Sequence, residues 1–97
     1  MAKASKALYN RDILMNAHKH LVADGCVKIF DRIQGWPKEY QILSLAAAFL
    51  LTCMSARLPA QDAFSAVKNL MYDPLTQSGM EARFQGMKYH LDTEVNA

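Results

Sequence analysis

Residues 40–56 read YQILSLAAAFLLTCMSA, and none of these seventeen side chains carries a formal charge. β-Branched residues are few and apolar positions do not alternate with polar ones, which argues against a strand. The three consecutive alanines, the leucines and the methionine are strong helix formers. Pro37 suits the first turn of a helix, whereas Pro59 cannot continue one. The stretch therefore predicts a helix over about residues 37–57, roughly 30 Å long at about 1.5 Å per residue.

Apolar side chains lie on nearly every side of this predicted helix. Two apolar stripes follow it at helical spacing: Ile42, Leu45, Phe49, Cys53 and Ala56 form the first, and Leu43, Ala47, Leu50 and Met54 form the second. A helix that is apolar nearly all round is usually buried, so we expect the other segments to enclose it. If they fall short, the uncovered strip must meet another chain, and a symmetric dimer is the commonest such arrangement.

The same stretch lies near the lower length limit for a membrane span, which is about 17 to 25 residues. Gln41, Ser44, Thr52 and Ser55 dilute its hydrophobicity, and no long basic cluster flanks it to set an orientation. Its central position in the sequence does not fit a signal peptide. We therefore expect the core helix of a soluble protein, with no membrane association.

The composition is typical of one folded domain. The chain has 97 residues, 52% hydrophobic and 21% charged, and a net charge of +2. A net charge this small does not by itself indicate a nucleic-acid partner. Cys26 and Cys53 are too few for a disulfide framework, and no secretory signal or glycosylation acceptor is present. We expect free thiols and a cytoplasmic location.

Four further segments complete the predicted fold. Ser5 can cap a helix over about residues 6–23, which Asp24-Gly25 would end. Residues 26–33 fit a strand or a short helix, and we favour the helix because no partner strand exists. Two more helices are expected over residues 60–71 and from Thr76 or Ser78 to about residue 90. The sequence thus predicts an all-α fold. It is a compact bundle of four to five helices around the central apolar helix at about 37–57, one domain over 1–97, with loose tails at 1–5 and 93–97.

No motif in the sequence points to catalysis, a cofactor or a metal. His18 and His20 are two residues apart, so on a helix their side chains point about 200° away from each other and cannot share one ion. Cys53 lies in the most apolar stretch, where a thiolate is disfavoured. The four glycines are isolated and form no phosphate-binding loop. We therefore predict a non-enzymatic protein with no catalytic, cofactor-binding or metal site.

The first functional hypothesis is a protein that acts by binding another protein. Such an adaptor, regulator or inhibitor would contact its partner through methionine and aromatic side chains, which are enriched at interfaces. We expect it to be a homodimer. A short helical chain without motifs also suits an accessory protein of a phage or mobile element, although no residue shows that origin. The candidate partner-binding residues are Trp36, Tyr72, Met80, Phe84 and Met87.

The alternative hypothesis is a small nucleic-acid-binding regulator that uses the basic N-terminal helix or the helix over residues 76–90. The connection between the last two predicted helices is long for a helix-turn-helix, whose turn has three or four residues. Acidic residues near the last helix would also oppose phosphate groups. The candidate contacts for this alternative are Lys3, Lys6, Arg11, Lys19, Arg83 and Lys88.

Overall fold

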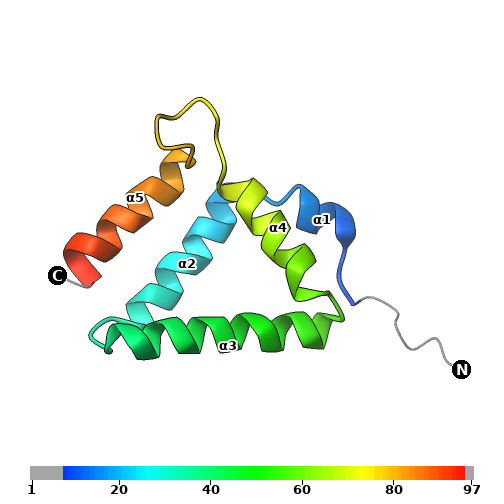
Figure 1. Cartoon of the computed structure of the whole chain (residues 1–97), viewed down its shortest axis with the longest axis horizontal. Coiled ribbons are helices and arrows are strands. Elements are labelled where there is room, and N and C mark those ends of the chain that lie inside the picture. The colour runs from blue at the N-terminus through cyan, green and yellow to red at the C-terminus, as the bar shows by residue number, and fades with distance from the viewer. Residues whose placement is uncertain (1–7, 96–97) are drawn as a thin grey trace, which may run out of the picture.

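The computed structural model describes residues 8–95, and within that range the chain is helical without a strand (Figure 1). An isolated antiparallel bridge joins Tyr72 to Met80. The predicted all-α class with four to five helices is confirmed. The helices are α1 (Arg11–Met15), α2 (Lys19–Ile33), α3 (Lys38–Ala56), α4 (Ala60–Met71) and α5 (Ala82–His90), and a short π-helix, η1 (Leu91–Val95), continues α5.

The helices are arranged in a flat assembly. In Figure 1, α2, α3 and α4 form three sides of a triangle, while α5 packs beside α2 and α1 packs beside α4. The shortest dimension of the molecule is 18 Å. Because one helix with its side chains is about 10–12 Å wide, no more than about two helices can stack across that dimension. A helix in such an assembly keeps at least one side open.

The core is small and lies where helices meet. Arg57 adopts the left-handed conformation, with φ of 59°, and ends α3, after which Pro59 precedes the first residue of α4. The corner between α3 and α4 holds a cluster of Cys53, Leu58 and Ala63, against which Tyr9, Leu14 and Ala56 pack. Phe84 on α5 and Ile33 at the end of α2 are also buried.

A buried side-chain hydrogen bond fixes the other end of α3. Gln41 is buried, and its Nε2 donates to the backbone oxygen of Ile33 over 3.1 Å. The connection between the two helices turns at Gly35, whose φ of 86° favours glycine. Since a buried amide without a partner is costly, this bond holds the first turns of α3 against the end of α2.

The rest of the chain does not enclose α3, and this corrects our expectation of a helix buried on nearly all sides. Only Gln41 and Cys53 are buried in it. Leu43 is 64% exposed, Leu50 49% and Met54 71%. The neighbouring helices cover one side, because α1 is a single short turn and α2 and α4 meet α3 mainly at its two ends (Figure 1). A helix that is apolar on all sides needs other helices to cover it, but its sequence does not show whether these belong to the same chain or to another one.

The helix predicted over residues 6–23 is divided in the structure, so that prediction is wrong in its bounds. Asn10 caps α1, with its Oδ1 accepting the N–H of Ile13 over 3.0 Å. The chain then leaves the helix at Asn16 and re-enters it at Lys19, and α2 continues through Gly25 to Ile33. Asparagine side chains compete with helical hydrogen bonds, which explains the break. The predicted cap Ser5 and the predicted tail at 1–5 lie outside the described residues.

The last helix also begins later than predicted. Thr76 and Ser78 lie in a loop instead of capping a helix, because the Thr76 Oγ1 donates to the Met80 oxygen over 2.8 Å. Glu81 is the cap, and its Oε1 accepts the N–H of Arg83 over 2.8 Å. At the other end η1 extends the helical region to Val95, so the predicted loose tail at 93–97 is helical over its described part.

Replacing Gly25 with alanine is expected to stabilise the protein by up to about 1 kcal/mol, the difference between the two residues inside a helix. A Cβ atom at this position meets no other atom within 4 Å. On a domain of this size, the unfolding temperature should rise by roughly 4–8 °C. The matched control is Gly35→Ala, which forces alanine to a φ of 86° and should lower the unfolding temperature. A lower unfolding temperature for Gly25→Ala would contradict the continuity of α2.

Candidate protein-binding surfaces

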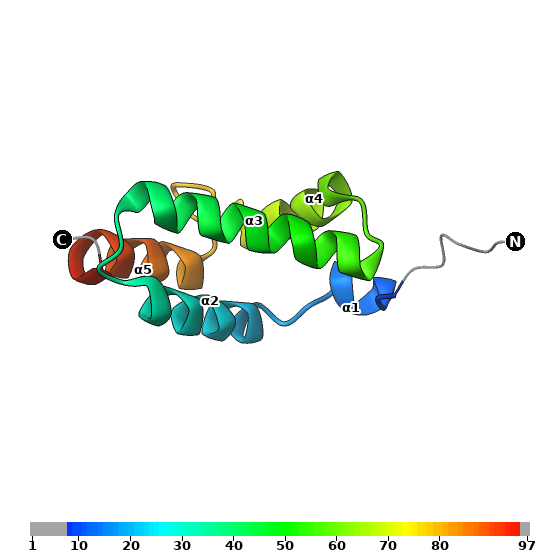
Figure 2. The same ribbon diagram turned by 90° about the horizontal axis from the view of Figure 1, so that it is seen from below.

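The outer side of α3 carries an apolar strip that no part of the described chain covers. We call it the α3 strip and define it as Tyr40, Leu43, Ala47, Leu50 and Met54. These positions are separated by steps of three and four residues, so they lie on one side of the helix. All five side chains are exposed. Figure 2 views the ribbon from below, and no other helix crosses in front of α3 in that view.

The α3 strip lies opposite the side of the helix that faces the protein. Gln41, Leu45 and Cys53 form the inner side, which contacts the rest of the chain and is buried or half-buried. Thr52 lies outside the strip, and its Oγ1 donates to the Ala48 oxygen of the same helix over 2.7 Å. The strip itself therefore presents aliphatic and aromatic groups with no charge among them.

α3 is also long and apolar enough to cross a membrane by length and composition. Its best 18-residue window has a mean hydropathy of 1.3, and 11% of that window is buried. A single helix of this kind is weak evidence for a membrane span, because core helices of soluble proteins and signal sequences have the same length and composition. Flotation with lipid vesicles would distinguish a membrane-spanning helix from a protein-binding one.

A second apolar surface is a groove of about 360 Å³ between α2, α4 and α5. Phe84, which is only 5% exposed, is one of the residues that line it. Lys88 lies at its edge and is paired with Asp92, with 2.8 Å between Nζ and Oδ2. Methionine thioethers adapt to differently shaped partners, so the groove suits an apolar side chain. The residues that line it are Val22, Cys26, Phe30, Val67, Met71, Met80, Phe84, Met87, Lys88 and Leu91.

The structure brings three of the five predicted partner-binding residues together. Met80, Phe84 and Met87 line the groove, although Phe84 is a buried core residue and offers no free ring to a partner. Tyr72 is 57% exposed and its ring lies over Gly79 in the loop before α5. Trp36 is 46% exposed in the turn between α2 and α3. Neither Tyr72 nor Trp36 lines the groove.

Sequence reasoning missed the α3 strip as a binding surface. Its positions were visible as the second stripe of the central helix, and we expected that stripe to be core. The signal that could have identified it was the shortness of the flanking segments, which cannot supply neighbours on both sides of a helix of 19 residues.

The basic residues of the alternative hypothesis are distributed over three elements. Arg11 lies in α1 and Lys19 begins α2. On α5, Arg83 forms an ion pair with Glu81 at 3.0 Å, and Lys88 forms its ion pair with Asp92. These carboxylates offset the positive charge that a phosphate group would need nearby. Lys3 and Lys6 lie outside the described residues.

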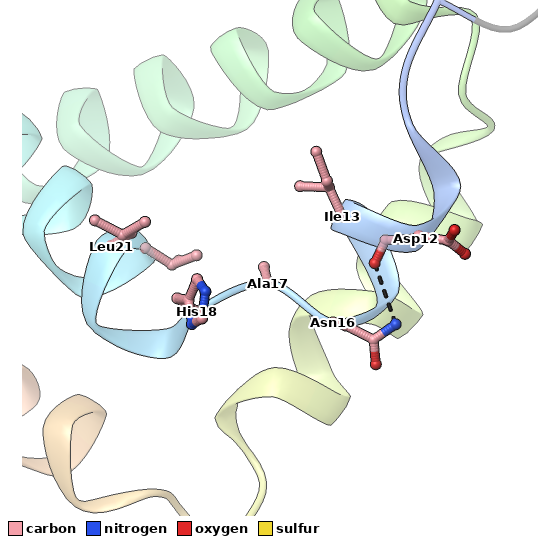
Figure 3. A pocket seen from close by; sticks show the side chains of 7 residues that line it. Asp12, Ile13, Asn16, Ala17, His18 and Leu21 are labelled. Atoms are coloured by element: carbon pink, nitrogen blue, oxygen red, sulfur yellow. Dashed lines mark hydrogen bonds between the residues drawn. The ribbon is translucent and has the colours of Figure 1, made fainter.

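The hollow between α1 and α2 shows no chemistry of its own (Figure 3). Asn16 Nδ2 donates to the backbone oxygen of Asp12 over 3.2 Å, and Ile13 and Leu21 are among the residues that line the space. The rings of His18 and His20 are 5.5 Å apart between centroids, which corrects the expectation that they point away from each other, because His18 precedes the first residue of α2 and has an extended backbone. Within the described part of the chain, no three histidine, cysteine or acidic side chains gather in a group that could hold a metal ion.

Burial raises the pKa of the Cys26 thiol above its ordinary value. The folded protein therefore keeps this proton to higher pH than the unfolded chain does. Stability should be constant below the thiol pKa of the unfolded chain, about 8.5, and should fall as the pH rises from there through the higher folded pKa. Cys26→Ser should remove that loss.

Alkylation of Cys26 by iodoacetamide, followed by mass spectrometry of the peptide, measures the same effect. The folded protein should react more slowly than the urea-unfolded chain at pH 8, since the thiolate is the reactive form. Equal rates in the two states would show that the thiol is not protected.

Comparison with protein-family models, with curated proteins and with solved structures gave no match.

Proposed function

We propose that this chain is a small non-enzymatic helical interaction protein that forms a homodimer and binds another protein, and that the α3 strip is one of its protein-binding surfaces. One observation carries the proposal. The most apolar helix of the chain has an uncovered apolar side, and that side lies opposite the contacts with α2 and α4. Large exposed apolar patches on a folded protein mark interaction sites.

The free energy available at the α3 strip is large enough for specific binding. Full burial of a leucine or methionine side chain is worth about 1.5–3 kcal/mol. Tyr40, Leu43, Leu50 and Met54 are each about half exposed or more. Folding of one chain leaves this stabilisation unused, whereas a protein partner that covers the strip would gain it, less the entropy lost on association.

A protein partner is favoured over a lipid bilayer because the inner side of α3 is fixed to the rest of the fold. To span a membrane, the helix would have to give up the bond from Gln41 to Ile33 and remove Cys53 from the corner cluster. A protein partner needs neither change, since it covers only the opposite side.

The experiment is light scattering on the purified protein from low to high micromolar concentration. We expect a mass twice the 10.9 kDa of one chain. A mass of one chain at all concentrations, together with no partner captured from a lysate, would sink the proposal. Flotation with neutral phosphatidylcholine vesicles should leave the protein in the dense fraction, and co-flotation would assign α3 to lipid. Retention on DNA that falls steeply with added salt would instead support the nucleic-acid alternative.

A further inference from the structure

We infer that the α3 strip pairs with the α3 strip of a second copy of this chain in antiparallel orientation. In this pairing, Leu43 of each copy faces Met54 of the other, and Ala47 faces Leu50. The inference deepens the proposed function and rests on it, because it names both the occupant of the strip and its orientation. Three independent features of the chain support it.

The first feature is the amount of exposed surface. A folded chain of 10.9 kDa exposes about 5,600 Å² by the scaling of surface with mass, whereas this chain exposes 7469 Å². Even after a full allowance for the nine residues outside the described range, an excess of about 800 Å² remains. A stable interface buries about 800 Å² on each partner. The excess is therefore of the same order as the surface that one copy contributes to a stable dimer.

The second feature is the order of side-chain sizes along the α3 strip. Steps of three and four residues are the spacing with which two helices interlock side by side at about 20°. A parallel pair would place Ala47 against Ala47, which leaves a gap between two leucine layers. The antiparallel pair places Ala47 against Leu50 in both central layers and Leu43 against Met54 in both outer ones. The layers then differ less in volume than in the parallel pair, where an Ala–Ala layer lies between Leu–Leu layers, and more even layers favour close packing.

The third feature is the charge at the two ends of α3. Glu39 lies in the first turn, and Arg57 follows the last. A parallel pair would bring the two copies of Glu39 together, and like charges repel. An antiparallel pair brings Glu39 to the end of the other helix that carries Arg57. It also places the positive end of each helix dipole beside the negative end of its neighbour.

Cysteine cross-linking tests the orientation. Leu43→Cys and Met54→Cys chains, each in a Cys26→Ser background, are mixed, exchanged and oxidised with copper phenanthroline. In the mixture we expect disulfide-linked dimers in roughly half of the chains, the share that random exchange between two kinds of copy gives. Leu43→Cys alone should not cross-link, because its two cysteines would lie about 16 Å apart along the helix axis. A disulfide needs Cα atoms within about 7 Å.

The outcomes separate this inference from the proposed function. A dimer in which Leu43→Cys cross-links to itself would show parallel helices and overturn the inference alone. A dimer in which neither the single variant nor the mixture cross-links would place the interface on another surface and would also overturn it. A protein that is monomeric before any substitution overturns this inference, and it overturns the proposed function as well only if no partner is captured from a lysate. Both positions are exposed within one chain, so these substitutions leave its core intact. Tyr40→Cys alone should also fail to cross-link, and it provides a second, independent test of the helix orientation.

Discussion

The double substitution Leu43→Lys/Leu50→Lys should convert the dimer to a monomer and raise its Kd by at least about a thousandfold, where each factor of ten is about 1.4 kcal/mol. Each dimer would lose four leucines from its interface, where each contributes about half of the roughly 1.5–3 kcal/mol that full burial gives, since Leu43 is 64% and Leu50 49% exposed in one chain. It would also gain four ammonium groups without partners in an apolar interface, and burial of unpaired charge is strongly unfavourable. Sedimentation or light scattering at several concentrations measures the change.

The matched control is Leu75→Lys, which makes the same chemical change at a leucine that is 93% exposed in the loop before α5. This variant should keep the mass of the unsubstituted protein. Circular dichroism should show equal helix content in both variants, because Leu43 and Leu50 contribute little to the core of one chain. If lysine disturbs α3, the glutamine pair Leu43→Gln/Leu50→Gln repeats the test without the added charge. A double variant that keeps the dimer mass would exclude the α3 strip as the interface.

The helix bounds that proline determines could be predicted from the sequence, and those that depend on side-chain competition could not. Pro37 and Pro59 flank α3, which was predicted at about 37–57 and lies at Lys38–Ala56, and α4 lies at residues 60–71 as predicted. Proline acts through its own covalent geometry, so its effect is local. In contrast, Gly25 was expected to end a helix and lies inside α2. Packing against α5 can retain a glycine in a helix, and a single sequence does not reveal that packing.

The candidate surfaces show the same division between local and tertiary information. The spacing of Phe84 and Met87 places them on one side of α5, and the structure brings them to one groove with Met80, which lies in the loop before the helix. The apolar residues of α3 could also be assigned to stripes. Which stripe is buried depends on where α2 and α4 meet the helix, and here the polar Gln41 lies inside while Met54 is 71% exposed. That choice follows from the tertiary arrangement and is not encoded in hydropathy.

Phe84→Ala is expected to destabilise the protein by about 3–5 kcal/mol, the usual range for removing a buried phenylalanine side chain. Phe84 is 5% exposed and lies on α5 where this helix packs against α2. Helices shorter than about 12–15 residues are marginal when isolated, and α5 has nine residues. Without this anchor, α5 should leave α2 and lose its helical structure. The unfolding temperature should fall by roughly 15 °C or more, at about 4–8 °C for each kcal/mol.

Phe64→Ala is the matched control, because Phe64 is 55% exposed on α4 and its ring lies 6.4 Å from that of Phe49 between centroids. Its loss should lower the unfolding temperature by a few degrees, since a half-exposed ring contributes correspondingly less apolar burial. Both variants need the same protein concentration, because the stability of a dimer depends on it. Equal losses in the two variants would mean that Phe84 does not anchor α5. For Phe84→Ala we expect a large fall in the unfolding temperature together with an unchanged dimer mass below the unfolding transition. That result would show that α5 stabilises the fold of one chain, whereas the α3 strip stabilises the contact between two chains.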